Sequence, residues 1–157
     1  MKKQKLSGQA GFTLIEILVV IGIIAILATI VLIAINPARQ FRQARDTQRV
    51  SNVNAILNAI GQYIADNEGK LPVDIDTDTA TKQLISSGDS NICLDLVPKY
   101  ISALPADPSA TGGPFDAAAC GGTYDSKYKI NVDVNGRVTI YASGEEPAGT
   151  DNISVTR

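Results

Sequence analysis

One carboxylate lies inside an apolar segment near the start of this 157-residue chain. The segment runs from Phe12 to Ile35, and 17 of its residues are Leu, Ile, Val or Phe. Glu16 is the one charged residue within it. An ionised acid is costly in hydrocarbon, so an acid inside a membrane segment usually has a function and a partner. The segment contains no basic residue that could pair with Glu16, which indicates that the partner belongs to another chain or is a newly made amino terminus.

The apolar segment is long enough to cross a membrane. At about 1.5 Å per residue, a helix over residues 12–35 spans about 36 Å, and a bilayer core is roughly 30 Å thick. Its apolar residues favour insertion by roughly 8 kcal/mol, whereas one acid opposes it by on the order of 3 kcal/mol. A cleaved secretory signal fits less well, because its apolar core has only about 7–15 residues and ends at small residues. Here Asn36 and Pro37 follow instead.

The rest of the sequence offers no spacing typical of catalysis or metal binding. It has no histidine and no nucleophile elbow, and two cysteines alone are too few for a structural zinc site. Asp74, Asp76 and Asp78 alternate, but Thr79 and Ile85 stand where an EF-hand needs glycine and glutamate. We therefore expect a solvated acidic loop, no metal, no cofactor and no enzymatic activity.

The part of the chain from Asp66 to Arg157 is acidic, with 14 acidic and 7 basic residues. Nucleic acid repels such a domain, so no direct binding of DNA or RNA is expected. Cys93 and Cys120 are an even count in a domain beyond a membrane anchor, which favours one disulfide. For a loop of this length the chain-entropy model gives about 3–4 kcal/mol of stabilisation.

A helix is expected to continue beyond the apolar segment. Pro37 lacks a backbone donor and disfavours helix in the residue before it, which predicts a break near Asn36. The helix then resumes to about Asn67, where Gly69 and Pro72 are stop signals. Apolar residues at spacings of three and four form a stripe that should pack on the outer domain: Val50, Val53, Leu57, Ile60 and Ile64.

Two strands are expected at residues 127–133 and 137–142, with a third at 152–157 and a short helix at 79–86. A two-residue turn would put the apolar residues of the first two strands on opposite faces. A three-residue loop instead pairs Val132 with Val138 and Ile130 with Ile140. We prefer the three-residue loop, with Gly136 in the left-handed conformation.

The beginning of the chain resembles the class III signal of type IV pilins and pseudopilins. The resemblance rests on the lysine-rich head, on Gly11, on the long apolar helix and on the sequence Phe12-Thr13-Leu14-Ile15-Glu16. It implies that prepilin peptidase cuts between Gly11 and Phe12, and that Phe12 is then N-methylated. It also implies that Glu16 meets the terminal amine of a neighbouring copy during assembly. That amine supplies the missing partner, because an acid and an ammonium offset each other's cost in hydrocarbon.

The same resemblance implies how the chain is divided. Residues 1–11 are a leader, 12–35 a transmembrane and filament-core helix, 36–67 an amphipathic extension and 68–157 an outer domain. The implied fold is the α+β pilin fold, with one long N-terminal helix packed on a small antiparallel sheet. The precursor would contact inner-membrane lipid, prepilin peptidase and an assembly platform, and identical copies would then form an extracellular helical filament.

Four arginines follow the apolar segment on a shared arc of the helix: Arg39, Arg42, Arg45 and Arg49. We interpret them as a collar that faces lipid phosphates at the bilayer surface. Ion pairing with acidic groups of neighbouring copies is an alternative. Direct DNA binding is disfavoured, because these residues would lie inward in a filament.

The resemblance leaves two kinds of filament subunit open. The cysteine pair and the missing calcium signature favour a type IV pilin. Residues 93–108, with Val97-Pro98-Lys99-Tyr100, instead resemble a segment of the major pseudopilins of type II secretion, which crosses the domain between helix and sheet. A membrane-tethered binding or enzymatic domain is the alternative from another class.

Overall fold

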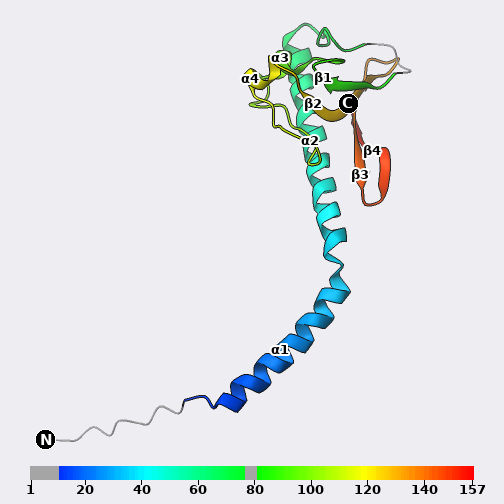
Figure 1. Ribbon diagram of the computed structural model, residues 1–157. Coiled ribbons are helices and arrows are strands. Elements are labelled where there is room, and N and C mark those ends of the chain that lie inside the picture. Colours follow the sequence, from blue (N-terminus) through cyan, green and yellow to red (C-terminus); the bar gives the residue numbers. More distant parts are fainter. Residues whose placement is uncertain (1–10, 77–80) are drawn as a thin grey trace, which may run out of the picture. The chain divides into compact units, whose positions relative to one another are not determined.

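The computed structural model describes residues 11–76 and 81–157. The leader residues 1–10 and Asp78 of the expected acidic loop lie outside the described residues. The chain forms two compact units, one that ends at Gln40 and one over Phe41–Arg157. The elements are α1 (Leu14–Ile35), α2 (Pro37–Asp66), β1 (Gln83–Ser86), α3 (Cys93–Leu96), α4 (Ala117–Cys120), β2 (Asp125–Val132), β3 (Val138–Glu145) and β4 (Ala148–Thr156) (Figure 1). A long N-terminal helical segment followed by a small antiparallel sheet is the α+β arrangement that the sequence predicts.

The helical segment is interrupted at Asn36, where Pro37 predicted a break. Asn36 lies in the left-handed region, with φ +48° and ψ +76°, and it ends α1. Pro37 opens α2, which suits a residue without an N–H, because the first N–H groups of a helix have no partner within the helix. The side-chain oxygen of Asn36 then accepts the N–H of Arg39 at 3.3 Å and caps the new helix.

In the second unit α2 lies against the sheet and fills the core with one face. Val53, Ile56 and Ile60 are fully buried, and they form one hydrophobic cluster with residues of β2 and β3. The predicted stripe is right at Val53, Leu57 and Ile60 and wrong at Val50, which is 44% exposed. Arg49 occupies the buried row one residue earlier, so Val50 is turned about 100° away from the core.

The sheet has four antiparallel strands in the order β1-β2-β3-β4. The predicted three-residue loop is confirmed, because Val132 faces Val138 and Ile130 faces Ile140. Gly136 has φ +78°, a value that glycine adopts without strain. This register places the apolar side chains of both strands on the face that meets α2.

Two predictions about strands need correction. Residues 83–86 form β1 rather than part of a short helix, and Ile85 and Ser86 are buried there. The strand pairs with β2 through Leu84 and Lys129, a long-range contact that outweighs local helix preference. The last strand, β4, begins at Ala148 and not at residue 152. The first residues of β4 do not alternate between apolar and polar, so the hydrophobic pattern of the sequence could not show where this strand begins.

The segment between α3 and α4 is tied by the Cys93–Cys120 disulfide, whose Cα atoms are 5.4 Å apart. It then passes between α2 and β2, as the resemblance to pseudopilins implied. Asn52 of α2 donates a side-chain hydrogen bond to the carbonyl of Ala106 at 3.2 Å. On the other side, the N–H of Asp107 donates to the carbonyl of Ser126 at 2.9 Å.

A group of ion pairs, here termed the Arg49 cluster, joins α2 to two other parts of the outer domain. Arg49 is 2% exposed and donates to both oxygens of Asp107, at 2.7 and 2.9 Å. It also reaches Asp46 and Glu145, each at 2.8 Å. Burial alone would raise the pKa of Asp107, but hydrogen bonds from Arg49 and Ser109 hold it below its usual value. Arg49 is therefore a fully paired structural cation.

The Arg49 cluster continues along the same side of α2. Arg45 pairs with Glu145, the last residue of β3, and Arg42 pairs with Glu146 in the turn that follows. Asp46 accepts the backbone N–H groups of Glu145 at 2.9 Å and of Glu146 at 2.7 Å. The predicted phosphate collar is thus wrong for Arg42, Arg45 and Arg49, because carboxylates of the same chain already neutralise them.

We expect acid to weaken this attachment. Hydrogen bonds from Arg45 and then Arg49 lower the pKa of Glu145 to about 2. Because the folded pKa lies below the unfolded one, the stabilisation is complete above about pH 4.5 and is lost as the pH falls toward about 2. Thermal unfolding of the full chain in detergent across this range should show a falling melting temperature. A Glu145→Gln variant should have a smaller acid-dependent decline, and an unchanged decline would contradict this assignment.

Candidate processing and assembly segment

Residues 11–13, which directly precede α1, are not helical, and they expose the peptide bond between Gly11 and Phe12. Residues 11–13 are outside the helix and exposed, and Thr13 has an extended backbone with φ −80° and ψ +151°. Exposed, non-helical backbone is where peptidases act most readily. The predicted cleavage position therefore lies next to the first helical turn and remains accessible.

Thr13 and Glu16 form a capping box at the start of α1. The hydroxyl of Thr13 accepts the N–H of Glu16 at 3.2 Å. In return, Oε2 of Glu16 accepts the N–H of Thr13 at 2.8 Å and its hydroxyl hydrogen at 3.0 Å. Glu16 therefore has a neutral partner in its own chain, which the sequence reasoning missed. A threonine three residues before a glutamate at the start of an apolar run is the known signature of this cap.

The capping box leaves Glu16 able to bind a cation. Both bonds from Thr13 end on Oε2, and no partner of Oε1 is recorded within residues 11–76 and 81–157. A carboxylate has about four lone-pair positions, so it can accept an ammonium while it caps the helix. Thr13 is neutral, so no described residue of the chain compensates the negative charge of Glu16. An ammonium is the kind of group that would complete this site.

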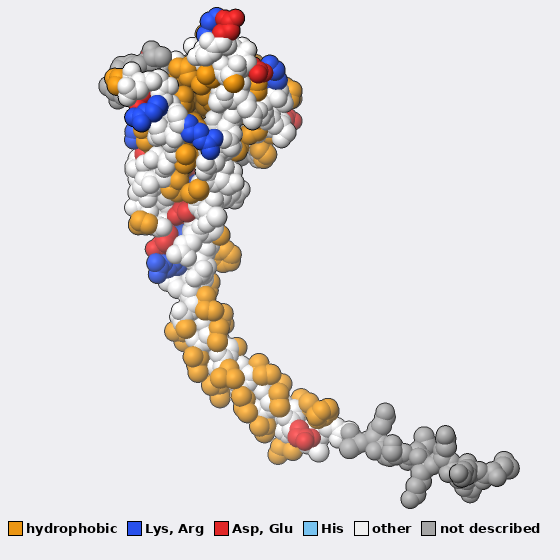
Figure 2. Space-filling view, turned by 180° about the vertical axis from the view of Figure 1, so that it is seen from behind, with side chains coloured by type: hydrophobic (Ala, Val, Ile, Leu, Met, Phe, Trp, Pro, Cys, Tyr) orange, Lys and Arg blue, Asp and Glu red, His pale blue; other side chains and the backbone are white. Residues whose placement is uncertain are grey.

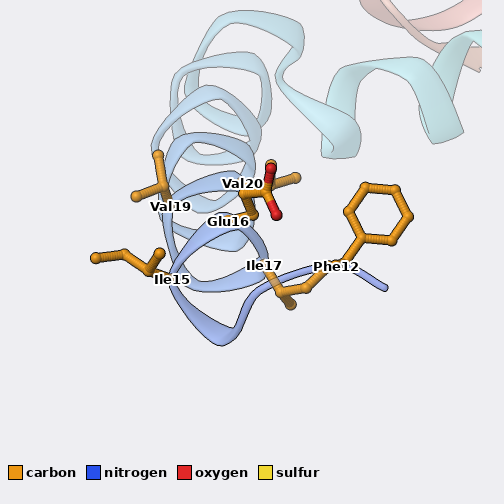
Figure 3. Close-up of a pocket in the computed structure, with 6 residues that line it drawn as sticks. All are labelled: Phe12, Ile15, Glu16, Ile17, Val19 and Val20. Carbon is orange, nitrogen blue, oxygen red and sulfur yellow. The ribbon is translucent and has the colours of Figure 1, made fainter. Parts of the chain in front are cut away.

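Phe12 and Glu16 lie near each other at the end of the apolar helix. Ile15 and Val19 point to one side, while the Glu16 carboxylate faces the side on which the Phe12 ring lies (Figure 3). The Phe12 side chain is 84% exposed. The candidate residues Gly11, Phe12 and Glu16 thus lie within six consecutive residues, in the short extended segment before α1 and in the first turn of α1.

The surface of α1 is apolar on every side. No side chain of Leu14–Ile35 is buried within the chain, and the helix is long and apolar enough to cross a membrane. Its exposed side chains are hydrophobic around a single acidic group (Figure 2). A helix that is apolar all round is stable only in lipid or among other apolar helices. The first unit therefore supplies an anchor and an acid, and it needs an apolar environment from outside the chain.

Other chemically capable groups lie in the second unit and serve its structure. The two candidate cysteines, Cys93 and Cys120, are joined to each other. Burial raises the pKa of Tyr124 and of Tyr128 to about 12, so both remain protonated near neutral pH. Within the described ranges no group of three or more metal-binding side chains was found.

Comparison with known families identifies a motif in the first unit. The prokaryotic N-terminal methylation motif matches residues 6–32. The match includes Gly11, Phe12 and Glu16 and most of α1, and it corresponds to the class III signal peptide of type IV pilins. The motif belongs to structural subunits of the pilin type, and it implies processing by prepilin peptidase and assembly of many copies. No curated protein and no solved structure matches the chain.

Proposed function

We propose that this chain is a structural subunit of a type IV pilus. It would insert into the inner membrane as a precursor, lose residues 1–11, become N-methylated at Phe12 and polymerise through α1. The observation that carries the proposal is the matched methylation motif on a helix whose side chains are all exposed. The helix would pass from lipid to the filament core without losing an apolar environment.

Cleavage would create a cationic partner for Glu16, in addition to its neutral partner Thr13. The new amino terminus of Phe12 is an ammonium, and N-methylation keeps its positive charge at neutral pH. Oε1 of Glu16 in a neighbouring copy would accept that ammonium, while Oε2 keeps its bonds to Thr13. Each charge is unfavourable alone in hydrocarbon, so the pair forms only where two copies meet. Processing would thereby control when copies can join.

Under this proposal the outer domain, residues 68–157, forms the filament surface. The ion pairs of Arg49 hold it to α2, and the Cys93–Cys120 disulfide joins α3 to α4 within it. The mature subunit would be a single-pass inner-membrane protein before assembly and an extracellular polymer afterwards. Its partners would be other copies, prepilin peptidase, an assembly platform and membrane lipid.

A major pseudopilin of a type II secretion system is the second candidate. Residues 93–108 favour it, because they pass between α2 and β2 as the corresponding segment of pseudopilins does. The two candidates differ in the assembly that they build. Long surface filaments of this chain in sheared cell material would support the pilus subunit. Its restriction to short periplasmic assemblies would support the pseudopilin instead.

Gly11→Leu is expected to block removal of the leader. Glycine before the cut is the residue that the class III signal requires, and a leucine side chain would occupy the peptidase subsite that normally takes none. Intact mass should show a chain that begins at methylated Phe12 for the wild type and an uncut chain for the variant. Gly22→Ala is the control, because no atom lies within 4 Å of a Cβ placed there. Continued trimming of Gly11→Leu would place the cut elsewhere, and an uncut wild-type chain would refute the processed subunit.

A further inference from the structure

Within the described residues, the chain closes one of the two edges of its sheet. At β1 the backbone groups of Leu84 that point away from β2 are bonded inside the chain. Its N–H donates to the carboxylate of Asp89 at 2.7 Å, and its carbonyl accepts the N–H of Ser90 at 3.0 Å. The strand order makes β4 the other edge. An edge strand offers unpaired N–H and C=O groups, which natural sheets usually cover, shorten or protect with charge.

The last part of β4 leaves its outer backbone groups open. Val138 and Arg157 exchange two backbone hydrogen bonds, of 2.8 and 3.0 Å. Because bonded pairs alternate along antiparallel strands, Val155 also directs its backbone groups at β3, whereas those of Ser154 and Thr156 point away from it. Among the residues that the structure describes, no hydrogen bond reaches these outward backbone groups. The five residues before Arg157 include no charged residue and no proline, which are the usual protections of an edge.

The apolar side chains of β4 are incompletely covered. Ile153 and Val155 are half-buried against the core, whereas Ile140 and Ala142, the inward residues of the neighbouring β3, are at most 1% exposed. The difference arises because β3 has a strand on each side and β4 has a strand on one side. A further strand beside β4 would remove more of both side chains from water.

The helix α2 runs beside this open edge (Figure 1). Near one end of β4, Glu146 pairs with Arg42 of the helix. At the other end, Arg157 donates to the side chain of Asn58. Asn58 is neutral, and among the described residues no acid is paired with Arg157. The open edge and α2 therefore form the two sides of a channel that has a cation at one end.

The channel is hollowed at two places along its length. A hollow of about 470 Å³ is lined by Val50 and Ile153 among others. A second hollow, of about 460 Å³, is lined by Leu57, Val138 and Arg157 among others. Both contain apolar walls from the helix and from the sheet. They suit the alternate side chains of an extended chain, which project to one side at every second residue.

We propose that the edge of β4 binds an extended peptide segment of another protein, which joins the sheet as a further strand. The backbone of this segment would pair with Ser154 and Thr156, and every second side chain would enter the channel beside α2. An acidic residue of the segment would meet Arg157. The inference goes beyond the proposed function and does not depend on it, because single subunits already present this edge.

A second copy of the chain is a poorer occupant than a foreign segment. The β1 edge of that copy is already bonded within its own chain through Leu84. Its remaining edge is β4, and antiparallel pairing of β4 with β4 would be twofold. Such a contact uses the same surface on both copies and closes after two of them, so it offers no edge for further copies.

Peptide binding to the full chain in detergent is the first test. The probe is a short labelled peptide of alternating valine and threonine, with glutamate at its amino end so that antiparallel pairing places the acid beside Arg157. We expect a dissociation constant on the order of 10–100 μM, and no binding at about 1 mM peptide would overturn the inference. Two further peptides carry N-methyl groups on one or the other set of alternate amides. One should bind more than about tenfold more weakly and the other within about twofold, and equal binding of these two would exclude backbone pairing.

Ser154→Pro tests the edge from the side of the protein, with Ser154→Ala as the matched control. Proline removes the outward N–H, and edge strands tolerate it where that N–H faces solvent. The proline variant should bind the peptide more than about tenfold more weakly at an unchanged melting temperature, and the alanine variant should stay within about twofold. Equal binding by the two variants would overturn the inference. If wild-type subunits formed dimers that Ser154→Pro abolished, the occupant would be a second copy and the inference would be wrong.

Arg157→Gln provides a measurement that does not require a change within the strand. It should weaken binding of the glutamate peptide about threefold, because the pair that it removes is exposed. A peptide with glutamine in place of the glutamate should bind this variant and the wild type equally. If the variant weakened both peptides to the same extent, the acid would not lie beside Arg157 and the proposed orientation would be wrong.

Discussion

Arg49→Met is expected to lower the free energy of unfolding of the outer domain by about 3–5 kcal/mol. The side chain is 2% exposed and is shared by Asp107, Asp46 and Glu145. Its removal leaves Asp107, itself 6% exposed, as a buried carboxylate without its cation. Breaking a buried pair costs far more than the pair contributes relative to apolar residues, because one desolvated charge remains. Denaturant unfolding of the full chain in detergent would measure the loss.

Arg42→Met is the matched control for this prediction. It removes an arginine from the same side of α2, but its pair with Glu146 is substantially exposed. Exposed pairs contribute about 0–1 kcal/mol, so the control should remain close to wild type. Combining Arg49→Met with Asp107→Asn should recover part of the loss, because the stranded charge is gone. If both arginine variants lost the same amount, the buried pair with Asp107 would not be the cause.

Glu16→Gln is expected to reduce filament yield on the order of 100-fold while insertion and cleavage remain normal. A glutamine at this position can still complete the capping box with Thr13, since that motif accepts either residue. The substitution therefore removes the negative charge and keeps the helix start. The ammonium of a neighbouring Phe12 would then lie unpaired in hydrocarbon, at a cost of roughly 2.5–3.5 kcal/mol. Quantifying sheared filaments against processed subunit in the membrane gives the ratio directly.

Thr13→Val supplies the complementary control, because it removes the hydroxyl of the cap and keeps the Glu16 carboxylate. It should reduce filament yield less than about tenfold, since a cap contributes about 1 kcal/mol. Glu16→Ala loses both the charge and the cap and should be the weakest assembler. If Glu16→Gln assembled as well as wild type while Thr13→Val did not, Glu16 would act only as a helix cap.

Local features of the fold could be predicted because the residues that cause them are adjacent in sequence. Pro37 alone predicts the break at Asn36, and the apolar alternation around Gly136 determines how Val132 meets Val138. The capping box was equally local, since Thr13 and Glu16 stand three residues apart. It was missed because the acid was interpreted through its charge rather than through its position in the first turn of a helix.

Long-range features could not be predicted in the same way. Arg49 looks like a membrane-facing cation in the sequence, because its acids Asp107 and Glu145 come from segments far along the chain. The strand β1 likewise depends on its pairing with β2 and has only four residues to mark it. In both places a tertiary partner decides the structure, and local propensity is too weak to oppose it.

The Arg49 cluster also has a mechanical consequence. A pull on α2 from its first residues reaches Arg42, Arg45 and Arg49 before it reaches the apolar core that begins at Val53. These arginines join the helix to the end of β3, to the β3–β4 turn and to the segment that contains Asp107, so several ion pairs connect the start of α2 to the rest of the domain. Resistance to such a load is set by the rate of unfolding under force and not by the equilibrium stability of the domain. The most charged part of α2 is therefore the part that would bear tension on the anchor before the apolar core does.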